Sequence, residues 1–191
     1  QELEIEVYHQ AIALEPHGRA RATMIANQAE GFMVLGDVGR AILGYRAALD
    51  SVDSNQAMHQ VAPTTLWSLG VALDRSGDLP GALDSIALAR VYDPNDRQIN
   101  GPGWFFVPEY ESDYYAALGH WLQGRRGAEI EDRLAGYERA VLSLSSFIAR
   151  APEHDHYLPV ARARLRSVSK EFAELQKKAS TPTPIDPKLP P

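Results

Sequence analysis

The sequence predicts an all-α fold of about eight helices, arranged largely as antiparallel pairs. In the clearest pair, at 63–96, apolar residues recur at helical spacing on both sides of a polar break at 76–78. The chain has 191 residues, 45% hydrophobic and 23% charged, which is ordinary for one folded domain or a short array. The residues that carry the helical spacing are Leu66, Leu69, Ala72 and Leu73 before the break and Ala82, Ile86 and Ala89 after it.

The break between the two helices has the residues that a tight turn needs. Gly77 accepts left-handed dihedrals without steric cost, and Asp78 can cap the second helix through its carboxylate. Pro80 falls in the first turn of that helix, where a missing amide donor costs nothing. Gly70 lets the two backbones approach closely. We expect the polar residues that close the first helix, Asp74, Arg75 and Ser76, to lead out into solvent.

These 34 residues resemble a tetratricopeptide repeat. Leu69 and Gly70 match the Leu-Gly pair of that family's first helix, and the Asp-Pro-Asn run at 93–95 matches its closing residues. One departure is Leu66, where the family often has tryptophan; the tryptophan comes one residue later, at Trp67. The resemblance implies a right-handed α-solenoid of antiparallel helix pairs, whose first helices line a concave surface.

A partial repeat is predicted at the start of the chain, at 1–18. Apolar residues recur from Leu3 to Leu14 with the spacing of a second helix alone. Because the matching first helix is missing, we expect the natural protein to extend further toward its N-terminus.

A full repeat is predicted at 22–55, where Gly36 and Asp37 stand at the position of the turn. The Leu-Gly pair is absent from its first helix, so we expect that helix to pack less typically. Residues 56–62 separate this repeat from the next, and we expect them to extend a helix on one or both sides.

The regular pattern changes after the clearest pair. Residues 97–111 form an aromatic loop punctuated by glycine and proline, and an expanded repeat follows at 112–152. A long amphipathic stripe predicts a capping helix at 155–178, because a last repeat would otherwise leave apolar surface exposed to water. The proline-rich tail at 179–191 is expected to be disordered.

The basic residues of the capping helix have two interpretations. The first is a solvated outer face with pairing between neighbouring turns, and the second is a docking site; we favour the first. The residues are Arg162, Arg164, Arg166, Lys170, Lys177 and Lys178.

Composition excludes several classes of function. A net charge of −6 argues against nucleic acid as a partner, since binding to it draws on clustered basic residues. The chain has no cysteine, which excludes disulfides, thiolate metal sites and cysteine nucleophiles. No catalytic motif or phosphate-binding glycine loop appears, so we expect a protein that is not an enzyme and holds no cofactor. Arginine outnumbers lysine 15 to 4, a hint of a GC-rich bacterial genome.

The compartment stays open. No run approaches the roughly 18 apolar residues that a membrane span needs, so we expect no membrane span. The chain begins with Gln1 rather than methionine, which suggests a processed form from which a signal or lipid anchor was removed. We therefore favour the bacterial periplasm or an outer-membrane association over the cytoplasm. The oligomeric state cannot be read from the sequence.

The register of the resemblance places candidate partner-binding residues on the concave face. Trp67 is expected to point toward this groove as an aromatic anchor, and the alternative is that it packs inside against the aromatic loop. The Lys and Asn set with which some relatives bind a C-terminal carboxylate is absent, so we expect no binding of that kind. The candidates on these helices are Asn27, Glu30, Met33, Val34, Trp67, Ser68, Val71, Arg75, Asp113 and His120.

The aromatic loop is the second candidate binding region. It either folds back to fill the groove or the gap between repeats, or contacts a partner as an aromatic and acidic lip, and both can hold. Its aromatic residues are Trp104, Phe105, Phe106 and Tyr110, and its acidic residues, with the first of the next helix, are Glu109, Glu111 and Asp113.

The expected function is a non-enzymatic scaffold that binds a peptide or helix of a partner protein in the groove, within a bacterial envelope machinery for motility, secretion or outer-membrane assembly. The alternative is a metal or small-ligand module that uses the aromatic loop and the Glu-His-Asp-His cluster at 153–156. His154 and His156 are its candidate ligands, although Asp155 in such a cluster is more often a helix cap. We therefore predict no metal site.

Overall fold

The computed structural model describes residues 2–15, 17–101, 106 and 108–180, and within them the chain forms eight helices and no strand. The all-α class and the number of helices are therefore as predicted. The helices are α1 (Glu2–Leu14), α2 (Arg19–Val34), α3 (Val38–Asp50), α4 (Asn55–Arg75), α5 (Leu79–Tyr92), α6 (Glu111–Arg126), α7 (Ile130–Arg150) and α8 (Leu158–Ala179).

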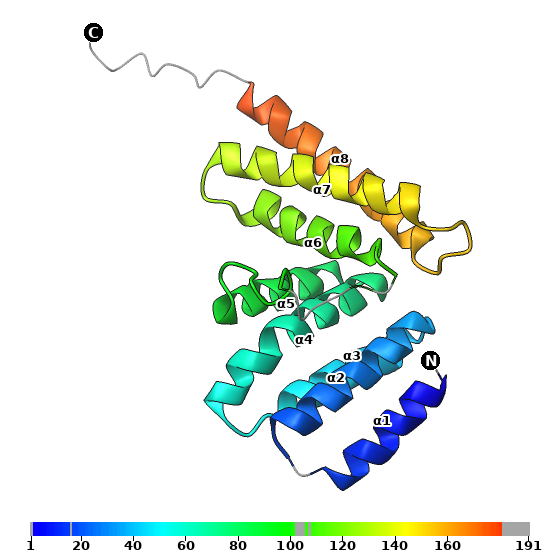
Figure 1. Ribbon diagram of the computed structural model, residues 1–191. Coiled ribbons are helices and arrows are strands. Elements are labelled where there is room, and N and C mark those ends of the chain that lie inside the picture. The colour runs from blue at the N-terminus through cyan, green and yellow to red at the C-terminus, as the bar shows by residue number, and fades with distance from the viewer. Residues whose placement is uncertain (1, 16, 102–105, 107, 181–191) are drawn as a thin grey trace.

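Consecutive helices pack as pairs. The most extensive contacts join α2 to α3, α4 to α5 and α6 to α7, while α2 also contacts α4, α4 contacts α6 and α6 contacts α8. Figure 1 shows the helices following one another in chain order from α1 at one end to α8 at the other. One hydrophobic core runs through these layers, and its largest fully buried side chains include Trp121, Tyr45, Tyr114 and Phe147.

Two of the turns within pairs are built as the sequence predicts. Gly36 and Gly77 have φ values of 78° and 101°, in the region that favours glycine. Asp37 caps α3 by accepting a 3.1 Å hydrogen bond from the Arg40 amide, and Asp78 caps α5 by accepting one of 2.9 Å from the Gly81 amide. Each turn therefore reverses the chain within the three residues that separate its two helices.

Close backbone approach at Gly70 is also confirmed. A Cβ atom added there would lie 3.0 Å from the Ala82 carbonyl oxygen and 2.9 Å from Ile86 Cγ1. The closest approach joins α6 and α7, where a Cβ on Gly136 would lie 2.5 Å from the Gly124 amide nitrogen. These glycines set the spacing of their helix pairs.

Helix α4 begins at Asn55 and not at Pro63, so residues 56–62 extend the helix that follows them. Pro63 lies inside α4 and has no amide hydrogen to donate to the carbonyl of His59. The Gln98 side chain replaces that donor, because its Nε2 lies 2.9 Å from the His59 oxygen. The expectation that residues 56–62 extend a helix is therefore confirmed, and a side chain from a later loop satisfies the carbonyl group that the proline leaves without a donor.

The polar end of α4 is buried, contrary to prediction. Asp74 is 0% exposed and the Arg75 side chain is 3% exposed. Helices α6 and α8 cover this end and supply polar partners, since Asp74 accepts hydrogen bonds from the Tyr114 hydroxyl and from Arg164 Nε at 2.7 Å. Arg164 therefore faces α4 rather than the solvated outer face expected for it.

Helix α8 begins at Leu158, three residues later than predicted, and Asp155 does not cap its first turn. Asp155 instead accepts hydrogen bonds from the Tyr157 amide at 2.7 Å and the Tyr110 hydroxyl at 2.8 Å. The predicted apolar stripe does pack against the core through Ala161, Leu165, Val168, Phe172 and Leu175. Most of the tail, from 181 onward, lies outside the described residues.

Candidate functional site

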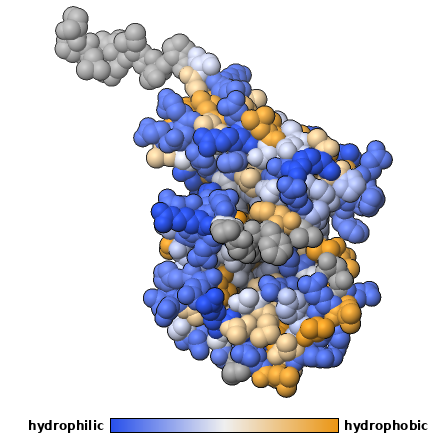
Figure 2. Space-filling view, in the orientation of Figure 1, coloured by the Kyte–Doolittle hydropathy of each residue, from blue (hydrophilic) through white to orange (hydrophobic). Residues whose placement is uncertain are grey.

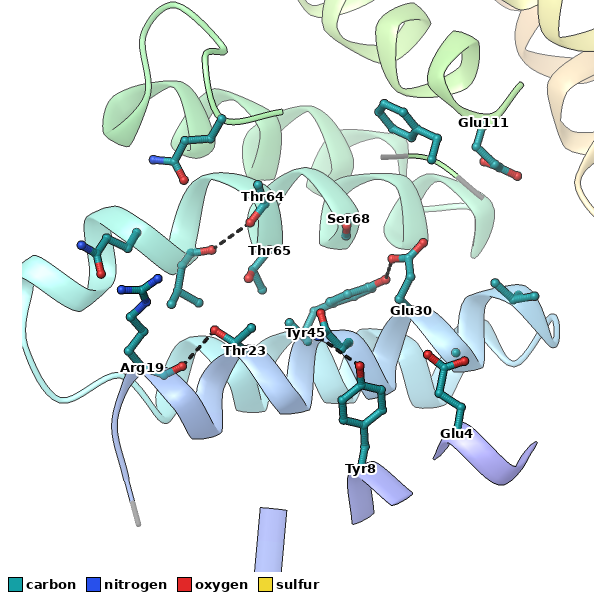
Figure 3. Close-up of a pocket in the computed structure, with 18 of the residues that line it drawn as sticks. Glu4, Tyr8, Arg19, Thr23, Glu30, Tyr45, Thr64, Thr65, Ser68 and Glu111 are labelled. Atoms are coloured by element: carbon teal, nitrogen blue, oxygen red, sulfur yellow. Dashed lines mark hydrogen bonds between the residues drawn. The ribbon is translucent and has the colours of Figure 1, made fainter. Parts of the chain in front are cut away.

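A cavity of about 840 Å³ lies between α1, α2 and α4 and reaches the start of α6 (Figure 3). Its volume falls within the roughly 300–1,000 Å³ that ligand pockets span. Most of the described side chains around it are polar or charged. They are Glu4, Tyr8, Arg19, Thr23, Asn27, Glu30, Tyr45, Gln60, Thr64, Thr65, Ser68, Gln98 and Glu111, with Ala26, Gly31, Val34, Val61, Gly101 and Phe106 completing the lining.

Glu30 is the half-buried carboxylate of this pocket. It projects from α2, and the Tyr45 hydroxyl of α3 donates a 2.6 Å hydrogen bond to its Oε2 atom, as Figure 3 shows. Burial raises the pKa of Glu30, although the hydrogen bond from Tyr45 and the charge of Arg75 oppose the shift. Close by, the Tyr115 hydroxyl of α6 donates a 3.2 Å hydrogen bond to Ser68 Oγ of α4.

A second carboxylate of the pocket, Glu111, is already paired. The Arg75 guanidinium forms an ion pair and hydrogen bond with Glu111 Oε2. The same guanidinium lies over the Tyr157 ring, 3.6 Å from its centroid, and within 4.8 Å of the centroid of Tyr114. Burial raises the pKa of Glu111, and the Arg75 charge opposes that shift. Arg75 Nε is buried and lacks a hydrogen-bond partner among the described residues.

The charges of the pocket are unevenly distributed. Among the described residues that line it, Glu4, Glu30 and Glu111 are acidic and Arg19 alone is basic. Arg19 and Glu30 both belong to α2, and eleven residues of helix separate them by about 16 Å. Figure 3 shows Arg19 at one end of the pocket and the three glutamates at the other. We call these the basic end and the acidic end.

Six of the predicted binding residues lie together in this pocket. Asn27, Glu30 and Val34 of α2 and Ser68 of α4 line it, as do Phe106 of the aromatic loop and Glu111 at the start of α6. Phe106 is half-buried and packs edge-on against Tyr115, with ring centroids 5.0 Å apart. This residue therefore packs against the core and also lines the pocket, while contact of the loop with a partner stays a prediction.

Trp67 does not point into the pocket, and this expectation was wrong. Its side chain is 4% exposed and packs toward α5 and α6, so closely that a Cβ on Gly119 would meet Trp67 Cη2 at 2.6 Å. The Arg90 guanidinium lies 5.3 Å from its ring centroid. The alternative of interior packing describes its position, although its neighbours are Gly119 and Arg90. A shift of one residue turns a helical side chain by about 100°, and here that turn leads to the next helix pair.

Several other predicted residues are core or structural groups outside the pocket. Met33 and Val71 are buried in the core, and Arg75 is a buried residue that forms an ion pair with Glu111. Asp113 accepts hydrogen bonds from Ser146 at 2.8 Å and Arg150 at 3.0 Å. Tyr110 is half-buried, and its hydroxyl donates a hydrogen bond to Asp155. His120 is half-buried, and burial lowers its pKa. The last two candidates, Trp104 and Phe105, lie outside the described residues.

The histidine cluster gives no support to a metal site. His154 and His156 are exposed, and Asp155 between them is engaged by Tyr110 and the Tyr157 amide. In the parts of the chain that the structure describes, no group of three or more His, Cys, Asp and Glu side chains could hold a metal ion.

Sequence reasoning missed several residues of the pocket. Tyr45 stands in the repeat at 22–55 at the spacing that Ile86 has in the next repeat, which indicates a packing residue, and its hydroxyl is the signal that a polar partner lies nearby. Thr64 and Thr65 belong to the first helix of the clearest pair but were given no role. Glu4 and Tyr8 come from α1, whose approach to α2 depends on packing between segments rather than on any local pattern.

Comparisons with family models, curated proteins and solved structures give no match to this chain. Among the described residues, no helix is both long and apolar enough to cross a bilayer. On the face seen in Figure 2, hydrophobic side chains are scattered among hydrophilic ones, and some gather at the end of the molecule where α1 lies. The exposed large apolar side chains of α1 are Leu3, Val7 and Leu14.

Proposed function

We propose that this chain is a non-enzymatic scaffold of the tetratricopeptide type, a right-handed solenoid that binds a segment of a partner protein between α2 and α4. The pairing of helices, the capped glycine turns and the contacts of α2 with α4 and α4 with α6 support this arrangement. In such an array the first helices of successive repeats line the concave face, and two of them, α2 and α4, border the cavity together with α1. A role in a bacterial envelope machinery stays a prediction from composition.

The observation that carries the proposal is the lining of the cavity. Asn27, Thr64 and Gln60 present amide and hydroxyl groups, which can bond the main chain of an extended segment. Phe106 and Val61 add apolar surface for its side chains. An extended segment rises about 3.3 Å per residue, so about five residues span the 16 Å between the two ends of the pocket. The site therefore suits a short peptide more than a broad, flat interface.

The test is a pair of tryptophan variants. Thr23 is exposed and lines the pocket, so Thr23→Trp should fill it without disturbing the core. Ala47→Trp is the matched control, because Ala47 is exposed on α3 and is not among the residues lining the pocket. Both variants are compared with the wild-type chain for capture of random 12-residue peptides displayed on phage.

We expect Thr23→Trp to abolish capture and Ala47→Trp to retain it, with both variants keeping the wild-type helicity by circular dichroism. Peptides that bind all three proteins equally would place recognition elsewhere. If the wild-type chain enriched no peptide, the proposal would fail.

A further inference from the structure

We infer that the acidic end of the pocket receives a basic side chain, an arginine or lysine of the partner segment, and that Glu30 is its main ligand. This inference rests on the proposed function and adds the chemistry of the partner to it. The inference depends on which carboxylates of the pocket already have a cationic partner within the protein.

Glu111 has its partner within the protein. Arg75 is paired with it and also contacts the rings of Tyr157 and Tyr114, so these groups hold the guanidinium in place. A second cation at Glu111 would meet the positive charge of Arg75 nearby. Glu111 is therefore a wall of the site rather than its principal ligand.

Glu30 has capacity left. Its Oε2 atom accepts one hydrogen bond from Tyr45, and among the described residues no other donor to this carboxylate is found. A carboxylate can accept about four hydrogen bonds. In Figure 3 its second oxygen points away from Tyr45. The lining therefore holds a partly buried acceptor that is only partly satisfied.

A cation satisfies such an acceptor better than a neutral donor does. Hydrogen bonds between two charged groups are roughly twice as strong as neutral ones, and an arginine can offer two parallel donors. The exposed Glu4 adds negative charge at the same end. Arg19, at about 16 Å, lies beyond the screening length of about 8 Å at physiological salt and offsets this charge little.

The same charges disfavour acidic ligands. A phosphate group or a C-terminal carboxylate placed at the acidic end would face Glu30 and Glu4 across a partly desolvated space. An acidic partner residue fits only at the basic end, beside Arg19. This polarity also gives the bound segment a direction, with its basic residue near Glu30.

The experiment sequences the 12-residue peptides selected on the wild-type chain and measures synthetic copies by fluorescence anisotropy. Each peptide is made in two forms, one with its selected basic residue and one with citrulline in that place. Citrulline keeps the shape of arginine without its charge. The protein variants are Glu30→Gln, which keeps an acceptor for Tyr45, Glu4→Gln, and Glu138→Gln as the matched control on the exposed face of α7.

We expect arginine or lysine at one position of the selected peptides, and at least tenfold weaker binding after citrulline replacement or in Glu30→Gln. Glu138→Gln should bind as the wild type does. Peptides that Thr23→Trp blocks but that show no basic preference would overturn this inference and leave the proposed function standing. Peptides that bind Thr23→Trp as well as they bind the wild type would overturn both this inference and the proposed function. A selection that enriches no peptide would do the same.

Discussion

Tyr45 and Glu30 join α3 to α2 through a 2.6 Å hydrogen bond between the tyrosine hydroxyl and the glutamate Oε2 atom. The contact holds a carboxylate at the wall of the pocket, and Tyr45 itself is only 1% exposed. Tyr45→Phe removes the donor and keeps the ring. We expect a loss of about 1–2 kcal/mol in the free energy of unfolding, measured with urea, because hydrogen bonds to charged groups contribute about 1.5–3 kcal/mol.

The control is Tyr8→Phe, since the Tyr8 hydroxyl accepts only an exposed 3.3 Å hydrogen bond from Asn27. That variant should lose less than about 0.5 kcal/mol. Equal losses of unfolding free energy in the two variants would mean that the hydrogen bond from Tyr45 to Glu30 does not stabilise the fold more than an exposed one does.

Peptide binding should depend on pH through Glu30. Burial raises the pKa of Glu30 in the free protein, and a bound cation would lower it again, so the complex holds fewer protons. Affinity should therefore rise with pH from the usual carboxyl value near 4.5 and level off once free Glu30 is ionised. The groups that face or influence Glu30 from other elements are Tyr45, Arg75, Glu111, Tyr115, Tyr157 and, at the pocket, Glu4.

The measurement is the dissociation constant of a selected peptide between pH 4.5 and 8. In Glu30→Gln the rise should be much smaller, with only the slope that Glu4 and Glu111 contribute remaining. An unchanged profile in Glu30→Gln would assign the titration to another group.

The buried pair of Asp74 and Arg164 should couple α4 to α8. Arg164→Met leaves a fully buried carboxylate without its cation, and such losses cost about 3–5 kcal/mol in well-buried pairs. Because Arg164 is 18% exposed and Tyr114 still donates to Asp74, we expect about 2–3 kcal/mol in urea unfolding. Adding Asp74→Asn should recover part of the loss.

Arg162→Met is the control, since Arg162 is exposed on the same helix. It should change the free energy of unfolding by less than about 0.5 kcal/mol. If the double variant were less stable than Arg164→Met, the cost would not come from the unpaired charge.

Gly136→Ala should loosen the packing of α6 on α7. Its new Cβ would meet the Gly124 amide nitrogen at 2.5 Å and the His120 carbonyl oxygen at 2.9 Å, and backbone atoms cannot move aside as side chains do. We expect the free energy of unfolding, measured with urea, to fall by about 1–3 kcal/mol, which is the typical cost of overpacking. Gly39→Ala, where the new Cβ would meet only Asp37 Oδ1 at 3.9 Å, should gain up to about 1 kcal/mol.

Local chemistry predicted much of this fold. The glycine turns and the caps at Asp37 and Asp78 depend on residues within one helical turn of each other, so the sequence alone indicates them. Likewise the apolar stripe of α8 is a local periodicity. These features indicate the turns that begin α3 and α5 and the face of α8 that packs against the core, while α8 itself begins three residues later than predicted.

The pocket and the buried charges could not be predicted in the same way. Asp74 and Arg164 lie 90 positions apart, and nothing near Asp74 in the sequence indicates that a cation will cover it. Polar residues at a helix end usually lead into solvent, and here tertiary packing reversed that tendency. Trp67 shows the same limit, because its burial depends on the small size of Gly119 in a later helix.

The most direct test of the central claim is a map of the bound peptide by NMR. Amide chemical shifts of the wild-type chain are followed while a selected peptide is added. We predict the largest changes at Thr23, Asn27 and Glu30 of α2 and at Thr64 of α4, with little change on the exposed faces of α3 and α5. Shifts concentrated on α3, α5 or α7, with α2 and α4 unaffected, would contradict the account.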